Sequence, residues 1–157
     1  MANLNKNPTA LTLKRRAAGL TRTQLAKAVG ISDRTIERWE QRRSDIADAE
    51  AASVLDIATA LNCDVADILD TVPKVDMSQK IDRAFSQAQK KPADTNLKKF
   101  RVAAGFTLEE LSNITGLQLQ AIAAYEAKRN NINCASARAV FALAAALNVP
   151  FAEILDR

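Results

Sequence analysis

The chain has 157 residues and a formal net charge of +4, with no histidine, two cysteines and one tryptophan. The length allows one domain of ordinary size or two small ones, and the missing histidine excludes imidazole general-base catalysis and most zinc chemistry. The longest apolar runs stop short of the ~18 residues of a membrane span, and the N-terminus lacks a secretory pattern. We therefore expect a cytoplasmic protein that has no membrane partner.

An internal repeat organises the chain. Residues 11–70 align without a gap on residues 97–156, and 23 of the 60 aligned positions are identical. The identities include the pairs Gly30 with Gly116 and Ile36 with Ile122, which a shared fold would require. We expect two copies of one domain of roughly 60 residues, a size that folds alone if its helices pack well.

The first two helices of each copy are marked by their ends. In the first copy, the first helix stops at Gly19, because glycine is the usual residue just past a helix end. Thr21 and Gln24 have the spacing of a capping box, which opens the second helix, and Leu25 points inward. Gly30 then breaks the chain. The second copy repeats this pattern 86 residues later.

The third helix is predicted to begin at Ser32 in the first copy and at Gln118 in the second. Ile36 and Trp39 recur three residues apart and mark the buried side of this helix. The second copy has an isoleucine and a tyrosine at the matching positions. Both third helices should therefore pack alike and differ only in their outward faces.

A fourth, alanine-rich helix and a brief fifth helix complete each copy. We predict the fourth helices at 49–61 and 135–147 and the fifth helices at 65–69 and 151–155. Cys63 and Cys134 lie in apolar helical surroundings without metal-binding spacing, so we expect reduced core cysteines and no metal or other cofactor. The sequence contains no nucleophile–base set and no phosphate-binding loop, so we expect no enzymatic activity.

The connector between the copies, 71–94, is predicted to be a helix. Proline stands near each end, at Pro73 and Pro92. Its interior places apolar residues on one helical face: Met77, Ile81, Ala84, Phe85 and Ala88. This apolar stripe needs a partner, either one of the two domains or the same helix of a second chain.

Charge is distributed unevenly within the first copy. Residues 14–43 hold nine basic and three acidic residues, a net charge of +6. Residues 44–70 hold seven acidic residues and no basic residue, a net charge of −7. The first stretch suits a polyanionic partner and the second does not.

Two helices joined by a glycine-containing turn, with a polar outer face on the second, form the arrangement that enters the DNA major groove. The first copy reads "GLTRTQLAKAVGISDRTIERWEQ", "VLDIATALN" and "ADILD", and the second reads "GFTLEELSNITGLQLQAIAAYEA", "VFALAAALN" and "AEILD". Both copies resemble the Cro/CI phage-repressor helix-turn-helix family, also called Xre-like. The resemblance implies an all-α fold of two tandem five-helix lambda-repressor-like domains, at 1–70 and 95–157.

The same resemblance implies one internal ion pair in each copy. An arginine of the first helix would reach the glutamate at the end of the third helix. Arg15 with Glu40, and Arg101 with Glu126, occupy these positions. We expect partly buried structural pairs, because both copies keep them.

The resemblance also implies that the start of the third helix touches base edges. The residues at these positions are Ser32, Asp33, Arg34 and Arg38. Arginine can bind guanine through two hydrogen bonds, and an aspartate can accept one from a cytosine amino group. For Ser32 and Asp33 a purely structural role remains open, since serine caps helices and an aspartate suits the first turn.

Contacts to phosphate are expected at two further places in the first copy. Thr21 and Arg22 lie at the start of the second helix, and Arg42 and Arg43 follow the third. Such contacts supply register and most of the affinity, and they make binding fall steeply with salt.

The second copy departs from this pattern. Between Arg101 and Lys128 it has no basic residue, and its second helix begins with two glutamates. The outward positions of its third helix are Gln118, Leu119, Gln120, Ala123 and Ala124. Glutamine can bind adenine, but an uncharged face with leucine and alanine also suits a protein surface, and we favour the protein contact.

These patterns together predict a sequence-specific transcriptional regulator, a repressor of the phage or mobile-element type, phage-encoded or associated with the bacterial nucleoid. A homodimer would place two third helices ~34 Å apart and prefer an inverted-repeat operator in double-stranded DNA. The alternative is an interaction subunit, antitoxin-like or regulatory, that binds a protein partner through 77–157 and uses DNA binding for autoregulation.

Overall fold

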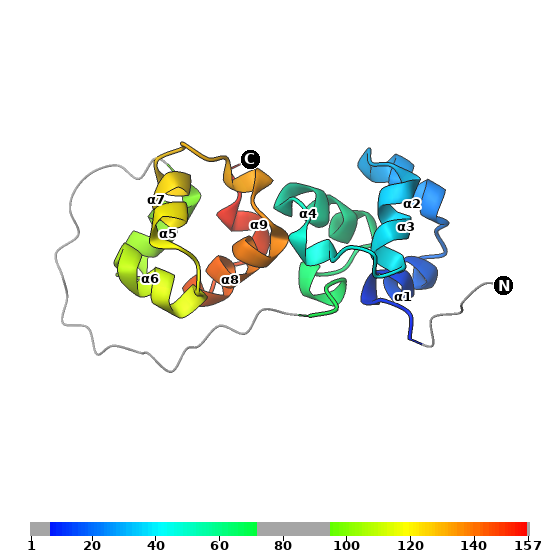
Figure 1. Ribbon diagram of the computed structural model, residues 1–157, viewed down its shortest axis with the longest axis horizontal. Helices are drawn as coiled ribbons and strands as arrows, with labels where there is room; N and C mark the ends of the chain where they lie inside the picture. Colours follow the sequence, from blue (N-terminus) through cyan, green and yellow to red (C-terminus); the bar gives the residue numbers. More distant parts are fainter. Residues whose placement is uncertain (1–6, 72–94, 157) are drawn as a thin grey trace. The chain divides into compact units, whose positions relative to one another are not determined.

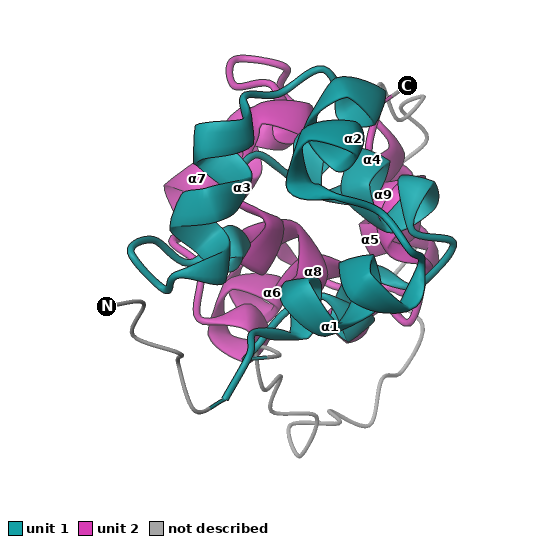
Figure 2. Cartoon of the chain, turned by 90° about the vertical axis from the view of Figure 1, so that its right-hand side faces the viewer, with its two compact units in different colours: residues 1–72 teal, residues 73–157 magenta. Residues whose placement is uncertain are grey.

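The computed structural model describes residues 7–71 and 95–156, and every regular element in these two ranges is helical (Figure 1). The chain divides into two compact units, residues 1–72 and 73–157 (Figure 2). The predicted all-α class is confirmed. The predicted connector helix falls on residues that lie, apart from Thr71, outside the described ranges. No helix within those ranges has the length and apolar character needed to cross a membrane.

The two units have the same order of elements up to the last one, which is a 3-10 turn in unit one and a short α-helix in unit two. In unit one these are α1 (Ala10–Ala17), α2 (Arg22–Val29), α3 (Asp33–Glu40), a 3-10 turn (Ile46–Asp48), α4 (Ala51–Ala60) and a 3-10 turn (Val65–Asp67). In unit two they are α5 (Asn96–Ala103), α6 (Leu108–Thr115), α7 (Leu119–Glu126), a 3-10 turn (Ile132–Cys134), α8 (Ala137–Leu147) and α9 (Phe151–Ile154).

The ends of α2 follow the signals in the sequence. The Thr21 side chain accepts a hydrogen bond from the Gln24 amide at 3.1 Å, and the Gln24 side chain accepts one from the Thr21 amide at 2.8 Å. This completes the predicted capping box. At the other end, Gly30 adopts a φ of +71°, a left-handed conformation that costs glycine little. These two ends fix the length of α2 and the turn that leads into α3.

A core of aliphatic side chains holds unit one together. Leu25 of α2, Ile36 of α3 and Ile57 of α4 have no exposed surface, and α2 packs against both other helices. Burying one such side chain stabilises the fold by about 1.5–3 kcal/mol. Unit two has fully buried residues at the matching positions: Leu111, Ile122 and Leu143. The two units therefore share one packing scheme.

An ion pair joins α1 to the end of α3. The Arg15 Nε donates to the Glu40 Oε1 at 2.6 Å and Nη2 donates to Oε2 at 3.0 Å, and both side chains are only 10% exposed. Arg15 Nη1 also donates to the Leu20 carbonyl at 2.7 Å, in the loop after α1. Arg101 and Glu126 form the same two-bond pair in unit two, at 2.6 and 2.7 Å. One guanidinium thus ties three segments together in each unit.

Three predicted helices differ from those in the structure. The fourth helices begin at Ala51 and Ala137, two residues later than predicted, because a 3-10 turn precedes each and buries an isoleucine. The predicted helix over 65–69 shrinks to the 3-10 turn Val65–Asp67. After this turn the Asp70 carboxylate accepts a hydrogen bond from the Ala10 amide at 2.8 Å.

Three side chains are less buried than predicted. Cys134 is a free, exposed thiol rather than a core residue, because it ends the 3-10 turn whose first residue, Ile132, fills the core. Its counterpart in the repeat is Asp48, which is also exposed. Cys63 is free and half-buried. Trp39 is half-buried as well, since one side of it lines a shallow pocket.

Replacing Glu40 tests the ion pair. Glu40→Ala leaves the Arg15 guanidinium unpaired in the interior and should destabilise unit one by about 3–5 kcal/mol. Trp39, the only tryptophan of the chain, lies in this unit, so its fluorescence reports unfolding of unit one in a urea titration. Glu37→Ala, at a side chain that is 38% exposed, should move the midpoint far less. An unshifted Trp39 transition in Glu40→Ala would contradict the structural role of the pair.

Candidate nucleic-acid interface

The surface of interest begins with α3, which packs on α2 after a short turn (Figure 1). Ile36 fills the core, so the opposite side of α3 faces away from the core. Arg34 and Arg38 are both exposed on this helix and lie four residues, or about one turn, apart. Neither forms an ion pair within the described part of the chain. Two unengaged guanidinium groups therefore stand side by side on one helical face.

The first residues of α3 are partly engaged in the helix itself. The Ser32 hydroxyl accepts a hydrogen bond from the Thr35 amide at 3.1 Å and lies 2.7 Å from the Thr35 hydroxyl, so Ser32 is the helix cap. Asp33 is an exposed first-turn residue, where a carboxylate is favoured by the helix dipole. Ser32 therefore acts as the helix cap. Because it is exposed, it also lies at the edge of the outward face.

At the start of α2, Arg22 is engaged by α3. Its Nη1 lies 3.2 Å from the Glu37 Oε1, and both side chains are 38% exposed. Glu37 also accepts a hydrogen bond from the Gln41 side chain at 3.0 Å. Thr21 caps α2 immediately before Arg22. The start of α2 therefore presents one arginine that is held by an exposed ion pair.

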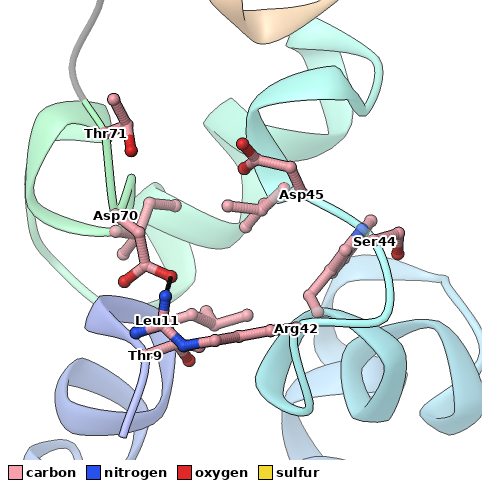
Figure 3. A pocket seen from close by; sticks show the side chains of 10 residues that line it. Thr9, Leu11, Arg42, Ser44, Asp45, Asp70 and Thr71 are labelled. Atoms are coloured by element: carbon pink, nitrogen blue, oxygen red, sulfur yellow. Dashed lines mark ion pairs between the residues drawn. The ribbon is translucent and has the colours of Figure 1, made fainter. Parts of the chain in front are cut away.

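Two arginines follow α3. Arg42 has a left-handed φ of +55°, and its amide donates to the Trp39 carbonyl at 3.0 Å. The Arg43 amide donates to the Arg38 carbonyl at 2.8 Å, which completes a Schellman turn. Arg42 Nη1 lies 3.3 Å from the Asp70 Oδ2, at the rim of the shallow pocket in Figure 3. Arg43 is exposed and has no ion pair among the described residues.

The comparisons with known proteins agree with this arrangement. Residues 11–74 match the family model of the Cro/C1-type HTH DNA-binding domain, and residues 97–154 match a helix-turn-helix family model. The chain therefore carries two tandem helix-turn-helix domains, the first of the Cro/C1 type. Curated proteins and solved structures gave no significant match. Unit one thus contains the first helix-turn-helix domain and unit two the second, and domains of this type bind DNA.

The two acidic partners, Glu37 and Asp70, were not predicted from the sequence. The Arg22–Glu37 pair left a trace in the repeat, because the second domain has Leu108 and Ala123 at the two matching positions. Both members of the ion pair change together, as contacting residues do. Asp70 gave no such signal, because the second domain also has an aspartate at the matching position, although the position that matches the arginine holds a different residue.

The matching face of the second helix-turn-helix domain differs in charge. Gln118 precedes α7 and makes no side-chain capping bond, and Gln120 is exposed in the first turn. Leu119 and Ala124 are half-buried. The capping box of α6 contains a carboxylate: Glu110 accepts from the Thr107 amide at 2.8 Å and from its hydroxyl at 2.9 Å, where α2 has a neutral glutamine. The start of α6 is therefore less favourable for a phosphate than the start of α2.

Among the residues of the described ranges, no group of histidine, cysteine or acidic side chains could hold a metal ion. The cationic face of the first domain is formed by the exposed residues Arg34, Arg38, Arg42 and Arg43. It offers guanidinium groups and a capped helix start, which are donors for phosphate oxygens and base edges.

Gln24→Glu tests whether the start of α2 meets DNA. Glutamate preserves the capping box, as Glu110 does in α6, but adds a negative charge beside Arg22. Two charges 4 Å apart in water interact by about 1 kcal/mol, so DNA affinity should fall about fivefold at low salt, with stability unchanged or higher. The reverse change in the second domain, Glu110→Gln, should leave DNA affinity unaltered. Fluorescence anisotropy with a labelled duplex measures both, and equal effects of the two variants would contradict the assignment.

Proposed function

We propose that the protein is a sequence-specific transcriptional repressor of the phage or mobile-element type, whose first domain reads the major groove with α3. The observation that carries this proposal is the contrast between two matching helices. Where α3 exposes Arg34 and Arg38, α7 has Gln120 and Ala124. Such a regulator acts where the DNA is, so we place the protein in the cytoplasm, at the nucleoid.

Base recognition is assigned to the outward face of α3. Arg34 and Arg38 are free to approach guanine, whose O6 and N7 accept two hydrogen bonds from one guanidinium. Asp33 can accept a hydrogen bond from a cytosine amino group, and Ser32 lies beside it at the helix start. The absence of an ion pair on either arginine, within the described residues, supports this assignment because neither has to break an internal contact first.

Phosphate contacts are assigned to both ends of the helix-turn-helix. Thr21 and Arg22 would meet the backbone at the start of α2, where the helix dipole also favours an anion. Arg42 and Arg43 would meet it after α3. These contacts carry no sequence information, but they fix the register in which α3 enters the groove.

The second domain is assigned to contact with protein. Gln118, Leu119, Gln120 and Ala124 give α7 an uncharged outward surface, which suits the same surface of a second chain better than it suits phosphate. A homodimer would present two α3 helices about one DNA turn, ~34 Å, apart and would prefer an inverted-repeat operator. If a foreign protein occupies this face instead, the purified chain is a monomer and DNA binding serves autoregulation.

Selection of bound sequences from random DNA by the purified full chain tests the proposal. It should yield an inverted repeat whose half-sites are rich in guanine where Arg34 and Arg38 reach. Recovery of DNA with no shared sequence would contradict sequence-specific reading.

Two substitutions separate base reading from phosphate binding. Arg38→Ala should cost about 1–3 kcal/mol on the selected site and much less on random DNA, because it removes a base contact. Arg43→Ala should weaken both DNAs alike and reduce the slope of log K against log salt by about 0.9. Equal losses on both DNAs for Arg38→Ala would remove Arg38 from base recognition.

A charge graft tests the assignment of α7. The double variant Gln120→Arg and Ala124→Arg gives α7 the residues that α3 carries at the same positions of the same fold, so it should fold normally. Like charges facing each other should then abolish a dimer formed through α7, as sedimentation equilibrium would measure. Asn113→Lys, which places the matching residue of the first domain at an exposed position of α6, should leave the dimer intact. A dimer that survives the double variant would contradict the assignment.

A further inference from the structure

Arg42 and Asp70 meet at the exit of α3. The Arg42 Nη1 lies 3.3 Å from the Asp70 Oδ2, and the side chains are 48% and 29% exposed. Figure 3 shows the guanidinium reaching across the mouth of the pocket to this carboxylate. An ion pair this exposed contributes less free energy than a network of protein–phosphate contacts. A second anion can therefore displace the carboxylate from Arg42.

The carboxylate is held in place independently of the arginine. Asp70 Oδ1 accepts a hydrogen bond at 2.8 Å from the amide of Ala10, the first residue of α1. The Arg42 backbone is fixed by the Schellman turn, and only its side chain has freedom. When the guanidinium leaves, Asp70 therefore stays where it is and continues to attract it.

We propose that Asp70 competes with DNA phosphate for Arg42 and thereby limits the affinity that this arginine contributes. The inference rests on the phosphate role assigned to Arg42 above. A guanidinium can satisfy a carboxylate or a phosphate oxygen with the same donors, so binding DNA requires the ion pair to open. Asp70 thus acts as a restraint on sequence-independent affinity, and it acts equally on every DNA sequence because phosphate contacts do not distinguish bases.

The second domain supplies a matched control. Asp156 occupies the position of Asp70, and its Oδ1 accepts a hydrogen bond from the Asn96 amide at 2.9 Å, as Asp70 does from Ala10. Lys128 occupies the position of Arg42 and has the same left-handed φ of +55°. Within the described residues, Lys128 and Asp156 form no ion pair. Asp156→Asn therefore removes the same charge from the same helix cap without releasing a side chain.

The test compares Asp70→Asn with Asp156→Asn in the full chain, by anisotropy on a labelled mixed-sequence duplex. Asparagine keeps an oxygen for the Ala10 amide and removes only the competing charge. Asp70→Asn should tighten binding about two- to fivefold, the worth of an exposed ion pair, and steepen the salt slope by up to about 0.9. Asp156→Asn should leave binding unchanged.

Arg42→Ala decides how the gain arises. In the Arg42→Ala background, Asp70→Asn should give no gain in DNA affinity, because the guanidinium for which Asp70 and phosphate compete is gone. A gain that persists there would overturn the inference, since Asp70 would then act only through its field. Weaker or unchanged binding by Asp70→Asn, while Arg42→Ala alone loses affinity, would overturn the inference and leave the proposed function standing. No loss of affinity in Arg42→Ala would overturn the phosphate role of Arg42 itself.

Discussion

The buried arginine–glutamate pair is the interaction on which the geometry of each domain depends. Arg15 holds both the Glu40 carboxylate at the end of α3 and the carbonyl of Leu20 in the loop that leads to α2. The helix that faces outward is thereby fixed at its end against α1, while Ile36 fixes its middle in the core. A helix held at two points presents its outward side chains in one orientation, which base recognition requires.

The duplication shows which features the scaffold needs and which it can vary. Both units keep the ion pair, the left-handed glycine after the second helix, and the fully buried isoleucine of the third helix. They differ at the outward positions of the third helix, where Asp33, Arg34 and Arg38 of one unit match Leu119, Gln120 and Ala124 of the other. Because the shared features lie inside, the outward residues can change without a change of fold.

Much of the fold could be predicted from the sequence because its signals are local. Capping boxes, glycine stops and the three-residue spacing of Ile36 and Trp39 act within one helix, and the repeat supplied each of them twice. The exposure of Cys134 was not predicted, because the alanine-rich sequence around it has no periodic pattern that shows which side of the short 3-10 turn faces the core. The position of its counterpart Asp48 carried that information.

The arginines of the candidate site could be predicted from the sequence, but the acidic residues that pair with them could not. Arg34 and Arg38 follow from the inward position of Ile36 on the same helix. The pairing of Arg42 with Asp70 joins residues 28 positions apart through the return of the chain to α1, and no periodic pattern encodes such a contact. Surface ion pairs depend on tertiary geometry. Which arginines lack an internal partner can therefore be identified only from the fold.

The proposed assignment of DNA binding to the first domain and of protein contact to the second has one direct test. Amide hydrogen exchange of the full chain, with and without a bound DNA duplex, measures which helix-turn-helix becomes protected. The account predicts DNA-dependent protection in the first domain, from Thr21 to Arg43, with Thr107 to Arg129 unchanged by DNA. Protection of equal size in both segments would mean that the uncharged face of α7 also binds DNA, and would contradict the assignment of DNA to the first domain alone.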